Sequence, residues 1–211
     1  MISLGKELTL RTYIFLDKMQ PQFAAYQATV AKGYLPVSGM ASIYVETAPG
    51  MPINRVTDVA LKQTNVRPAE LIVERAFGLL EIHHESQAEV LTAGQAILDA
   101  LGLKEEERLK PKVVTNQIIK KIDDYQSMIL NRTWRGMMIL HDQSLFIMET
   151  QPSGYITFAA NEAEKAADIS IVGIRAAGAF GRLYISGWEA DVQAAAEAAT
   201  KAIEGIKGTE W

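Results

Sequence analysis

Apolar side chains recur at every second position in several short segments of the chain, and this pattern predicts strands. In Leu79–His83, the residues Leu80 and Ile82 form one apolar face, which is typical of a strand buried on one face only. His83 is then expected to face solvent or an interface. Similar runs predict further strands at Leu10–Asp17, Ser42–Thr47, Glu70–Arg75, Val113–Ile122, Leu145–Thr150 and Ile169–Ile174.

Other segments have the spacing of amphipathic helices. The clearest begins after a capping box, Ser86-x-x-Glu89. An apolar stripe with i, i+3, i+4 and i+7 spacing then runs through Val90–Leu101, and Gly102 is expected to be the C-cap. Its counterpart, Asp191–Ile206, is rich in alanine, which lets a helix lie close to a sheet or another helix. Further helices are predicted at Phe23–Ala31, Ile53–Gln63, Tyr125–Arg132 and Ile156–Ala166.

The second half of the chain repeats the first at an offset of 103 positions. From residue 33 to residue 83 the two halves share 12 identities over 51 positions without a gap, including Glu46-Thr47 with Glu149-Thr150. We therefore expect two copies of one domain, residues 1–105 and 106–211, joined by a solvated connector in the charged stretch 104–112. Each copy would be a sheet of about four strands covered by helices, so the expected fold class is α+β.

The composition is that of an ordinary globular protein and excludes several classes of function. A net charge of −4, from 21 basic and 25 acidic residues, argues against broad binding to nucleic acid. The absence of cysteine excludes disulfides, thiolate nucleophiles and cysteine-ligated metal or iron–sulfur sites. Apolar runs are too short to cross a bilayer, and residues 1–8 lack the apolar stretch of a signal peptide, so we expect a cytoplasmic protein.

Residues that could carry out catalysis are scarce. The three histidines, His83, His84 and His141, form no metal-ligand or catalytic motif, so we expect no catalytic residue, no metal site and no cofactor. The glycine-rich segment Gly173–Gly181 has the composition of a phosphate-binding loop but is predicted to join two strands. A helix N-terminus that could bind a phosphate is therefore not expected there. These patterns predict neither nucleotide binding nor enzymatic activity.

One pair of opposite charges stands where a strand meets a tight turn. Glu74 and Arg75 come at the end of a predicted strand, directly before the small-residue segment Ala76–Gly78. The second copy has Ala177-Gly178 at the corresponding positions, so we expect any role of these charges to belong to the first domain. From the residues alone, a solvated strand end is the simplest interpretation.

The order of these elements resembles that of the bacterial microcompartment shell domain. The resemblance consists of a strand ending in Glu-Thr, a helix with a lysine, a strand, a glycine-rich turn, a strand and an alanine-rich helix. The second copy carries it most clearly, in residues 145–150, 161–169 and 178–183. The extra strand and helix at the start of each copy are similar to the circularly permuted form of this domain. From about Leu10 to Ile206 the chain resembles the tandem-domain carboxysome shell proteins, with support from Arg11–Asp17, Val73–Gly78 and Lys110–Val114.

The resemblance implies an assembly with a pore. Such proteins form trimers in which six domains make a pseudo-hexamer that tiles a shell, and two trimers can stack face to face. Their pore lies on the threefold axis, and an adjacent Glu and Arg that match Glu74 and Arg75 form its gate. The flexible positions of the pore loops would be Ala76, Gly78, Gly178 and Gly181. A lysine at the edge of the tile matches Lys62 and Lys165.

The expected function is that of a structural, pore-forming protein of the carboxysome shell. Its partners would be further copies of the chain, as a homotrimer or a stacked pair of trimers, and other shell hexamers, with no nucleic acid and no membrane. The pore would pass metabolites such as ribulose bisphosphate and 3-phosphoglycerate during carbon dioxide fixation. Two other classes stay open: a trimeric small-molecule-binding or sensory protein with ligand clefts between domains, and an enzyme. The lysine in both copies favours the lattice, and the missing catalytic constellation disfavours the enzyme.

Overall fold

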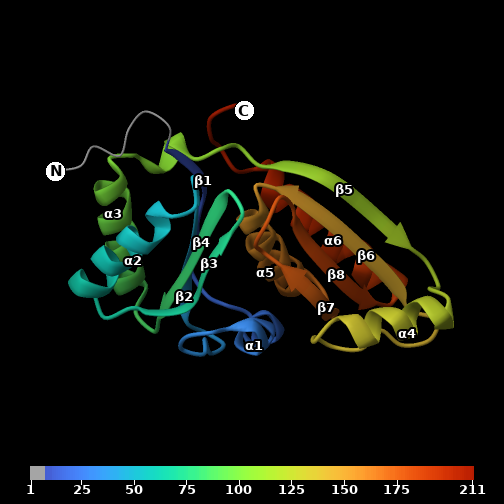
Figure 1. Cartoon of the computed structure of the whole chain (residues 1–211). Helices are drawn as coiled ribbons and strands as arrows, with labels where there is room; N and C mark the ends of the chain where they lie inside the picture. Colours follow the sequence, from blue (N-terminus) through green and yellow to red (C-terminus); the bar gives the residue numbers. More distant parts are fainter. Residues whose placement is uncertain (1–7) are drawn as a thin grey trace.

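Each half of the chain forms one antiparallel sheet of four strands (Figure 1). The computed structural model describes residues 8–211, so residues 1–7 of the expected first domain lie outside the described part. The strands are β1 (Thr9–Leu16), β2 (Ala41–Ala48), β3 (Arg67–Glu74), β4 (Phe77–His84), β5 (Lys112–Ile119), β6 (Ser144–Gln151), β7 (Ser170–Arg175) and β8 (Gly181–Gly187). Their orders are β1-β2-β4-β3 and β5-β6-β8-β7. The prediction of an α+β fold with two similar sheets is therefore confirmed.

The helices also repeat, at offsets of 102 to 104 positions between their first residues. They are α1 (Pro21–Val30), α2 (Pro52–Gln63), α3 (Gln87–Leu101), α4 (Asp124–Thr133), α5 (Ile156–Ala166) and α6 (Glu189–Glu204), with 3₁₀ turns η1 (Glu105–Glu107) and η2 (Ser153–Tyr155). β1 and β5, α1 and α4, and β2 and β6 begin 103 positions apart. Gly102 ends α3 with a φ of 70°, as predicted for its C-cap. The predicted capping box is wrong, because Ser86 makes no side-chain cap and Glu89 accepts a hydrogen bond from the Asn65 N–H instead.

The first sheet is covered on both faces, and this overturns the prediction of a half-buried strand at Leu79–His83. On one face, α2 and α3 pack against Leu80 and Ile82, which are fully buried. On the other face, Glu81 is 0% and His83 is 2% exposed. That face belongs to a core which includes side chains of α1 and of the second half of the chain. His83 therefore does not face solvent, because a second layer covers a face that the local pattern predicts to be open.

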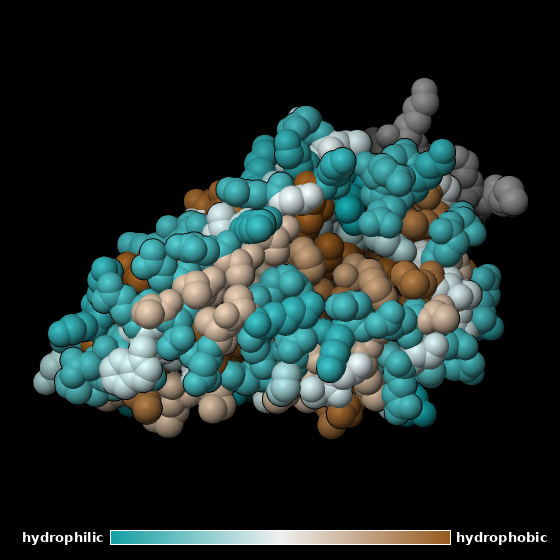
Figure 2. Space-filling view, turned by 180° about the vertical axis from the view of Figure 1, so that it is seen from behind, coloured by the Kyte–Doolittle hydropathy of each residue, from teal (hydrophilic) through white to brown (hydrophobic). Residues whose placement is uncertain are grey.

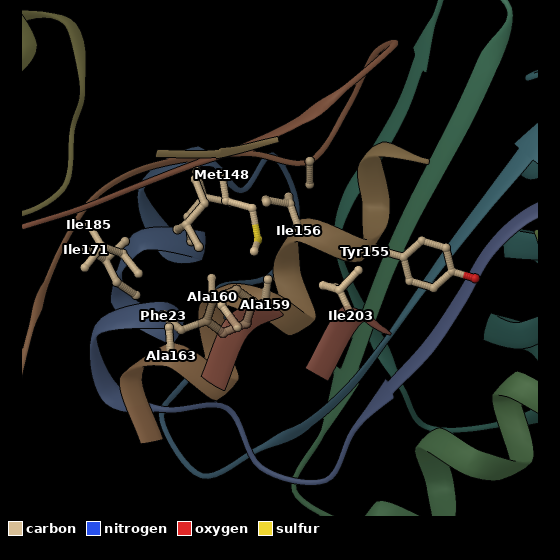
Figure 3. Close-up of a cluster of buried hydrophobic side chains, with 14 of the residues drawn as sticks. Phe23, Met148, Tyr155, Ile156, Ala159, Ala160, Ala163, Ile171, Ile185 and Ile203 are labelled. Atoms are coloured by element: carbon tan, nitrogen blue, oxygen red, sulfur yellow. The ribbon is translucent and has the colours of Figure 1, made fainter. Parts of the chain in front are cut away.

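Helix α1 lies between the two sheets and joins the domains (Figure 1). The carboxylate of Glu164 in α5 accepts hydrogen bonds from the backbone N–H groups of Gln22 and Phe23, at 2.7 and 2.8 Å, and so caps α1 from the second domain. The side chain of Gln22 donates to the Ile169 carbonyl and accepts from the Ile171 N–H. Phe23 lies among the alanines of α5 (Figure 3), so the hydrophobic core continues from one domain into the other.

The charged stretch between the domains is only partly a solvated connector. The expected boundary at 105/106 falls within η1, which is exposed. Arg108, however, donates to the carbonyl groups of Tyr13 and Lys207, at 2.7 and 3.0 Å. Tyr155, whose ring points toward strands of the first domain in Figure 3, donates to the Leu109 carbonyl at 2.8 Å. A groove of about 860 Å³ lies between this stretch, α5 and α6, and Figure 2 shows apolar side chains gathered in it between hydrophilic rims.

Candidate pore-loop site

The hairpin that carries Glu74 and Arg75 ends in a two-residue turn. Glu74 pairs with Phe77 as the last residues of β3 and β4, so the turn consists of Arg75 and Ala76. Arg75 has a φ of 53°, which lies in the left-handed region that favours glycine. Both turn residues are exposed. The structure thus places the predicted gate residues at an exposed end of the first sheet.

The corresponding hairpin of the second domain has a longer turn. β7 ends at Arg175 and β8 begins at Gly181, which leaves residues 176–180 as the loop. Gly178 has a φ of 111°, and Arg75, at the corresponding position of the first copy, also has a positive φ. A Cβ atom on Gly178 would lie 3.3 Å from the carboxylate of Glu74. The turns of the two domains are therefore in contact.

An ion pair that no sequence pattern predicted joins these two turns. Nη2 of Arg175 lies 3.3 Å from Oε1 and 3.4 Å from Oε2 of Glu74. The expectation that the charges act within the first domain alone is therefore wrong. It failed because Arg175 corresponds to Ile72 in the repeat, so the comparison of the two copies gave no hint of a charge there. A cavity of about 180 Å³ lies at this contact, and Glu70, Glu74 and Arg175 are among its lining residues.

A second arginine lies beside this ion pair. Arg182 faces Arg175 across the β7–β8 pairing. Its Nε donates to Glu149 at 3.0 Å, and the Thr115 hydroxyl donates to the same carboxylate at 2.7 Å. The hydrogen bond from Thr115 and then that from Arg182 lower the pKa of Glu149. Each of the two facing arginines thus has a glutamate of its own.

Gly78 and Gly181, predicted as flexible positions of the loops, are strand residues that close packing requires. Gly78 lies in β4, and a Cβ atom there would collide with the carbonyl oxygen of Gly50. Gly181 begins β8, and a Cβ atom there would collide with the carbonyl oxygen of Ser153. Ala76 and Gly178 do lie in the turns, and their mobility stays a prediction.

Two buried carboxyl groups, one on β3 and one on β4, lie on the inner face of the first sheet. Glu70 of β3 faces Glu81 of β4 in the strand register. Glu81 accepts hydrogen bonds from the Ser42 hydroxyl at 2.5 Å and the Ala69 N–H at 3.0 Å, and its Oε2 lies 3.1 Å from Nδ1 of His83. Burial and the charge of Glu81 raise the pKa of Glu70 from 4.5 to about 7. The alternating pattern concealed this cluster, because it predicts that these polar residues face water.

The glutamate of the Glu-Thr motif in the first copy also links the domains. Glu46 is fully buried and accepts hydrogen bonds from Arg11 Nε at 2.9 Å and from the Thr12 hydroxyl at 3.1 Å. Across the junction it accepts the Gly154 N–H at 3.1 Å, close to the start of α5. The guanidinium of Arg11 lies 3.6 Å above the ring of Phe77, the residue that follows the gate turn. The motif therefore positions both the turn and the next domain.

The two lysines expected at the tile edge have different surroundings. Lys62 of α2 is exposed and pairs with Asp58, one helical turn away, at 2.8 Å. Lys165 of α5 pairs with Glu162 at 2.7 Å and with Asp17 of the first domain at 3.3 Å. Burial acts to lower the pKa of Lys165, but these two carboxylates outweigh it and raise the pKa. Lys165 therefore also contributes to the junction of the domains, and the edge role of both lysines stays a prediction.

The two turns can act chemically through their charges, because they carry exposed arginine and glutamate side chains and contact each other. Residues 8–211 contain no group of three His, Asp or Glu side chains that could hold a metal ion. Among the helices in this part of the chain, none has the length and apolar character needed to span a membrane.

The chain matches known families over most of its length. Residues 10–107 match the CsoS1D N-terminal domain, and residues 144–209 match the BMC domain. The chain is 49% identical over 201 residues to the carboxysome shell protein CcmP of Synechococcus elongatus. The matched region covers 95% of this chain and 94% of that protein. The chain belongs to the family of tandem-domain microcompartment shell proteins that includes CcmP. This shell protein is also 52% identical over 198 residues to the carboxysome shell protein CsoS1D of Hydrogenovibrio crunogenus, with 93% and 97% of the two chains covered.

Two solved structures share the fold over nearly the whole shell protein. A fused permuted hexameric shell protein from the RMM microcompartment has a TM-score of 0.91 at 45% identity, covering 94% of this chain and 100% of that one. A double-ringed trimeric shell protein from the same microcompartment has a TM-score of 0.93 at 41% identity, covering 97% and 100%. The predicted tandem permuted shell domains are thereby confirmed. The expectation of a structural protein rather than an enzyme is confirmed as well, since these relatives are shell proteins.

Proposed function

We propose that this shell protein is a trimeric tile of the carboxysome shell, with a gated central pore that passes phosphorylated metabolites. The compartment is inferred from the two relatives named as carboxysome shell proteins, which are more similar in sequence to this chain than the two RMM shell proteins. A trimer, alone or as a stacked pair, is supported by the relative described as double-ringed and trimeric. The observation that carries the proposal is the uncovered outer face of α4.

Helix α4 has the same position in the second domain as α1 has in the first, but its outer face has no cover within residues 8–211. In α1, Gln22 is bonded to the backbone of the second domain and Tyr26 is buried. The corresponding residues of α4, Tyr125 and Ile129, are 76% and 60% exposed. Figure 1 places α4 at the end of the molecule, away from the first sheet. An apolar face of this kind on a helix calls for a partner.

The first domain has the matching surface for α4 of another chain. In the second domain Glu164 of α5 holds α1, and the corresponding residue of α2 is Leu61, which is exposed. Contact between Tyr125 of one chain and Leu61 of the next would repeat the junction within the chain, with apolar groups in place of polar ones. Each contact joins two different surfaces, so chains that follow one another head to tail through this contact can close into a ring. Three two-domain chains would then form a ring of six similar junctions.

The touching turns of the two domains would surround the axis of this ring. Each chain would contribute the exposed Arg75 together with Arg175 and Arg182 of the second domain. Guanidinium groups bind phosphate through paired hydrogen bonds, so anions such as ribulose bisphosphate and 3-phosphoglycerate are the cargo that fits. Glu74 and Arg75 would act as the gate: in one state Glu74 of each chain would pair with Arg75 of the next chain. Three such exposed ion pairs supply only about 1–3 kcal/mol in total and so allow two states.

Lattice contacts with other shell hexamers would come from the lysine-bearing helices at the tile edge. Lys62 is exposed on α2 and has only its helical neighbour Asp58 as a partner, so its ammonium group is accessible to a neighbouring tile. Lys165 would take the corresponding place on α5, while its bonds to Asp17 and Glu162 fix its position.

Aspartate substitutions in α4 test the ring. Tyr125→Asp and Ile129→Asp should each convert a particle of about 70 kDa, three chains of 23.2 kDa, or its stacked pair into monomers. The physical reason is that an unpaired carboxylate is costly to bury in an apolar contact. Leu91→Asp in α3, an exposed apolar residue outside the proposed junction, is the matched control and should leave the trimer intact. Light scattering measures the mass, and a monomeric wild type or trimeric α4 variants would contradict the proposal.

Electron microscopy and uptake experiments test the pore. Wild-type trimers should appear as discs with a central opening. Shells assembled with this protein should take up 3-phosphoglycerate faster than shells assembled without it. Equal uptake would contradict the transport role without affecting the evidence for a trimer.

A further inference from the structure

Arg175 lies at the proposed gate but is not one of the two residues expected to form it. We propose that Arg175 is a third gate residue, which holds the Glu74 carboxylate across the domain junction and so competes for it with Arg75 of a neighbouring chain. This inference rests on the proposed pore, and it gives the second domain a part in controlling the gate. Sequence patterns gave no indication of it, because the two partners are 101 positions apart.

The backbone on both sides holds the two partners in place. Glu74 is the last residue of β3 and Arg175 is the last residue of β7, so sheet pairing sets the positions of both main chains. Nη2 of Arg175 lies within 3.4 Å of both Glu74 oxygens. The missing side chain of Gly178 leaves space at this point, since a Cβ atom would lie 3.3 Å from the same carboxylate. The second domain thus provides both the charge and the room for Glu74.

Neighbouring charges favour this position of Glu74. Arg182 faces Arg175 across the two strands, and like charges at facing strand positions repel each other. Arg182 is already bonded to Glu149 at 3.0 Å, so Glu74 is the carboxylate that neutralises Arg175. With Glu74 in this position, Arg75 has no ion-pair partner within residues 8–211.

One carboxylate cannot neutralise both arginines at once. When Glu74 binds Arg175, the guanidinium of Arg75 is free to meet phosphorylated anions in the pore. When Glu74 binds Arg75 of a neighbour, Arg175 and Arg182 face each other and only one glutamate, Glu149, is left to neutralise the two. Glu74 is 37% and Arg175 is 53% exposed, so the pair is weak and the two arrangements differ little in free energy. Such a small difference lets an anion in the pore shift the populations.

Arg175→Gln distinguishes the two pairings in trimers of the full chain. Classification of particles in cryo-electron microscopy gives the ratio of turns in which Glu74 binds a neighbour's Arg75 to turns in which it does not. Loss of Arg175 should raise this ratio about two- to fivefold, as expected for one exposed ion pair. Arg67→Gln, at the opposite end of β3 from the turn, is the matched control and should leave the ratio unchanged.

A second background shows whether Arg175 acts through Glu74. In Glu74→Gln trimers, Arg175→Gln should have no further effect on the conformation of the turn, because the shared carboxylate is gone. The inference is overturned if Arg175→Gln leaves the ratio unchanged, if it acts equally with and without Glu74, or if every variant shows a single turn conformation. Failure to form a trimer or a central pore would instead overturn the proposed function, so the two failures can be told apart.

Discussion

Replacing Glu70 by glutamine should stabilise the protein above pH 7 and have little effect below pH 5. Glu70 is buried on the inner face of the first sheet and faces Glu81 in the strand register. Burial first, and the charge of Glu81 second, raise the pKa of Glu70 from 4.5 to about 7, and Lys32 offsets this only in part. Ionisation of Glu70 therefore destabilises the folded protein. Glutamine cannot ionise, so the variant avoids this cost.

The sign and the size of the effect follow from proton linkage. The folded protein binds the proton of Glu70 more tightly than the unfolded chain does, so its stabilisation is complete below pH 4.5 and is lost as the pH rises through 7. A rise of the pKa from 4.5 to about 7 corresponds to about 3 kcal/mol for each chain. Glu70→Gln should avoid this loss. For a chain of this length, its melting temperature at pH 8 should lie about 6–12 °C above that of the wild type.

Thermal unfolding of the assembled protein at pH 5, 7 and 8, followed by circular dichroism, measures the difference. Glu85→Gln removes an exposed carboxyl just beyond β4 and controls for the change in net charge, so it should melt with the wild type at each pH. An advantage of Glu70→Gln that is equal at all three pH values would refute the reasoning, because the cause would then be packing and not ionisation. No advantage at pH 8 would refute it as well.

Two further changes test the packing of the turns and the tile edge. Gly78→Ala should destabilise the protein by about 1–3 kcal/mol in denaturant unfolding, because its Cβ would collide with the Gly50 carbonyl. Gly187→Ala, whose Cβ would make only ordinary contacts, should be close to neutral, and equal stability of the two variants would contradict the argument. Lys62→Asp should leave trimers intact but prevent them from forming sheets in electron microscopy. Sheets that form as in the wild type would show that Lys62 has no role at the tile edge.

Much of the fold and part of the site could be predicted because the relevant patterns are local and occur twice. Strands and helices depend on the periodicity of neighbouring residues, and the offset of 103 positions shows each pattern in two copies. The C-cap at Gly102 was correct because only the local backbone conformation decides it. The exposed turn at Glu74 and Arg75 could be located for the same reason, since charges followed by small residues mark the end of a strand.

Local patterns along the chain therefore predict two similar α+β domains and the positions of their turns, but the packing of the two domains sets what those turns and faces contact. Period-two alternation predicts which residues share a face, but burial of Glu81 and His83 required α1 and the second domain to cover that face. Likewise, the bonds of Glu46 to Gly154 and of Arg175 to Glu74 join positions about 100 residues apart. Such contacts leave no local pattern, because they depend on how two complete domains pack and not on the neighbours of each residue along the chain.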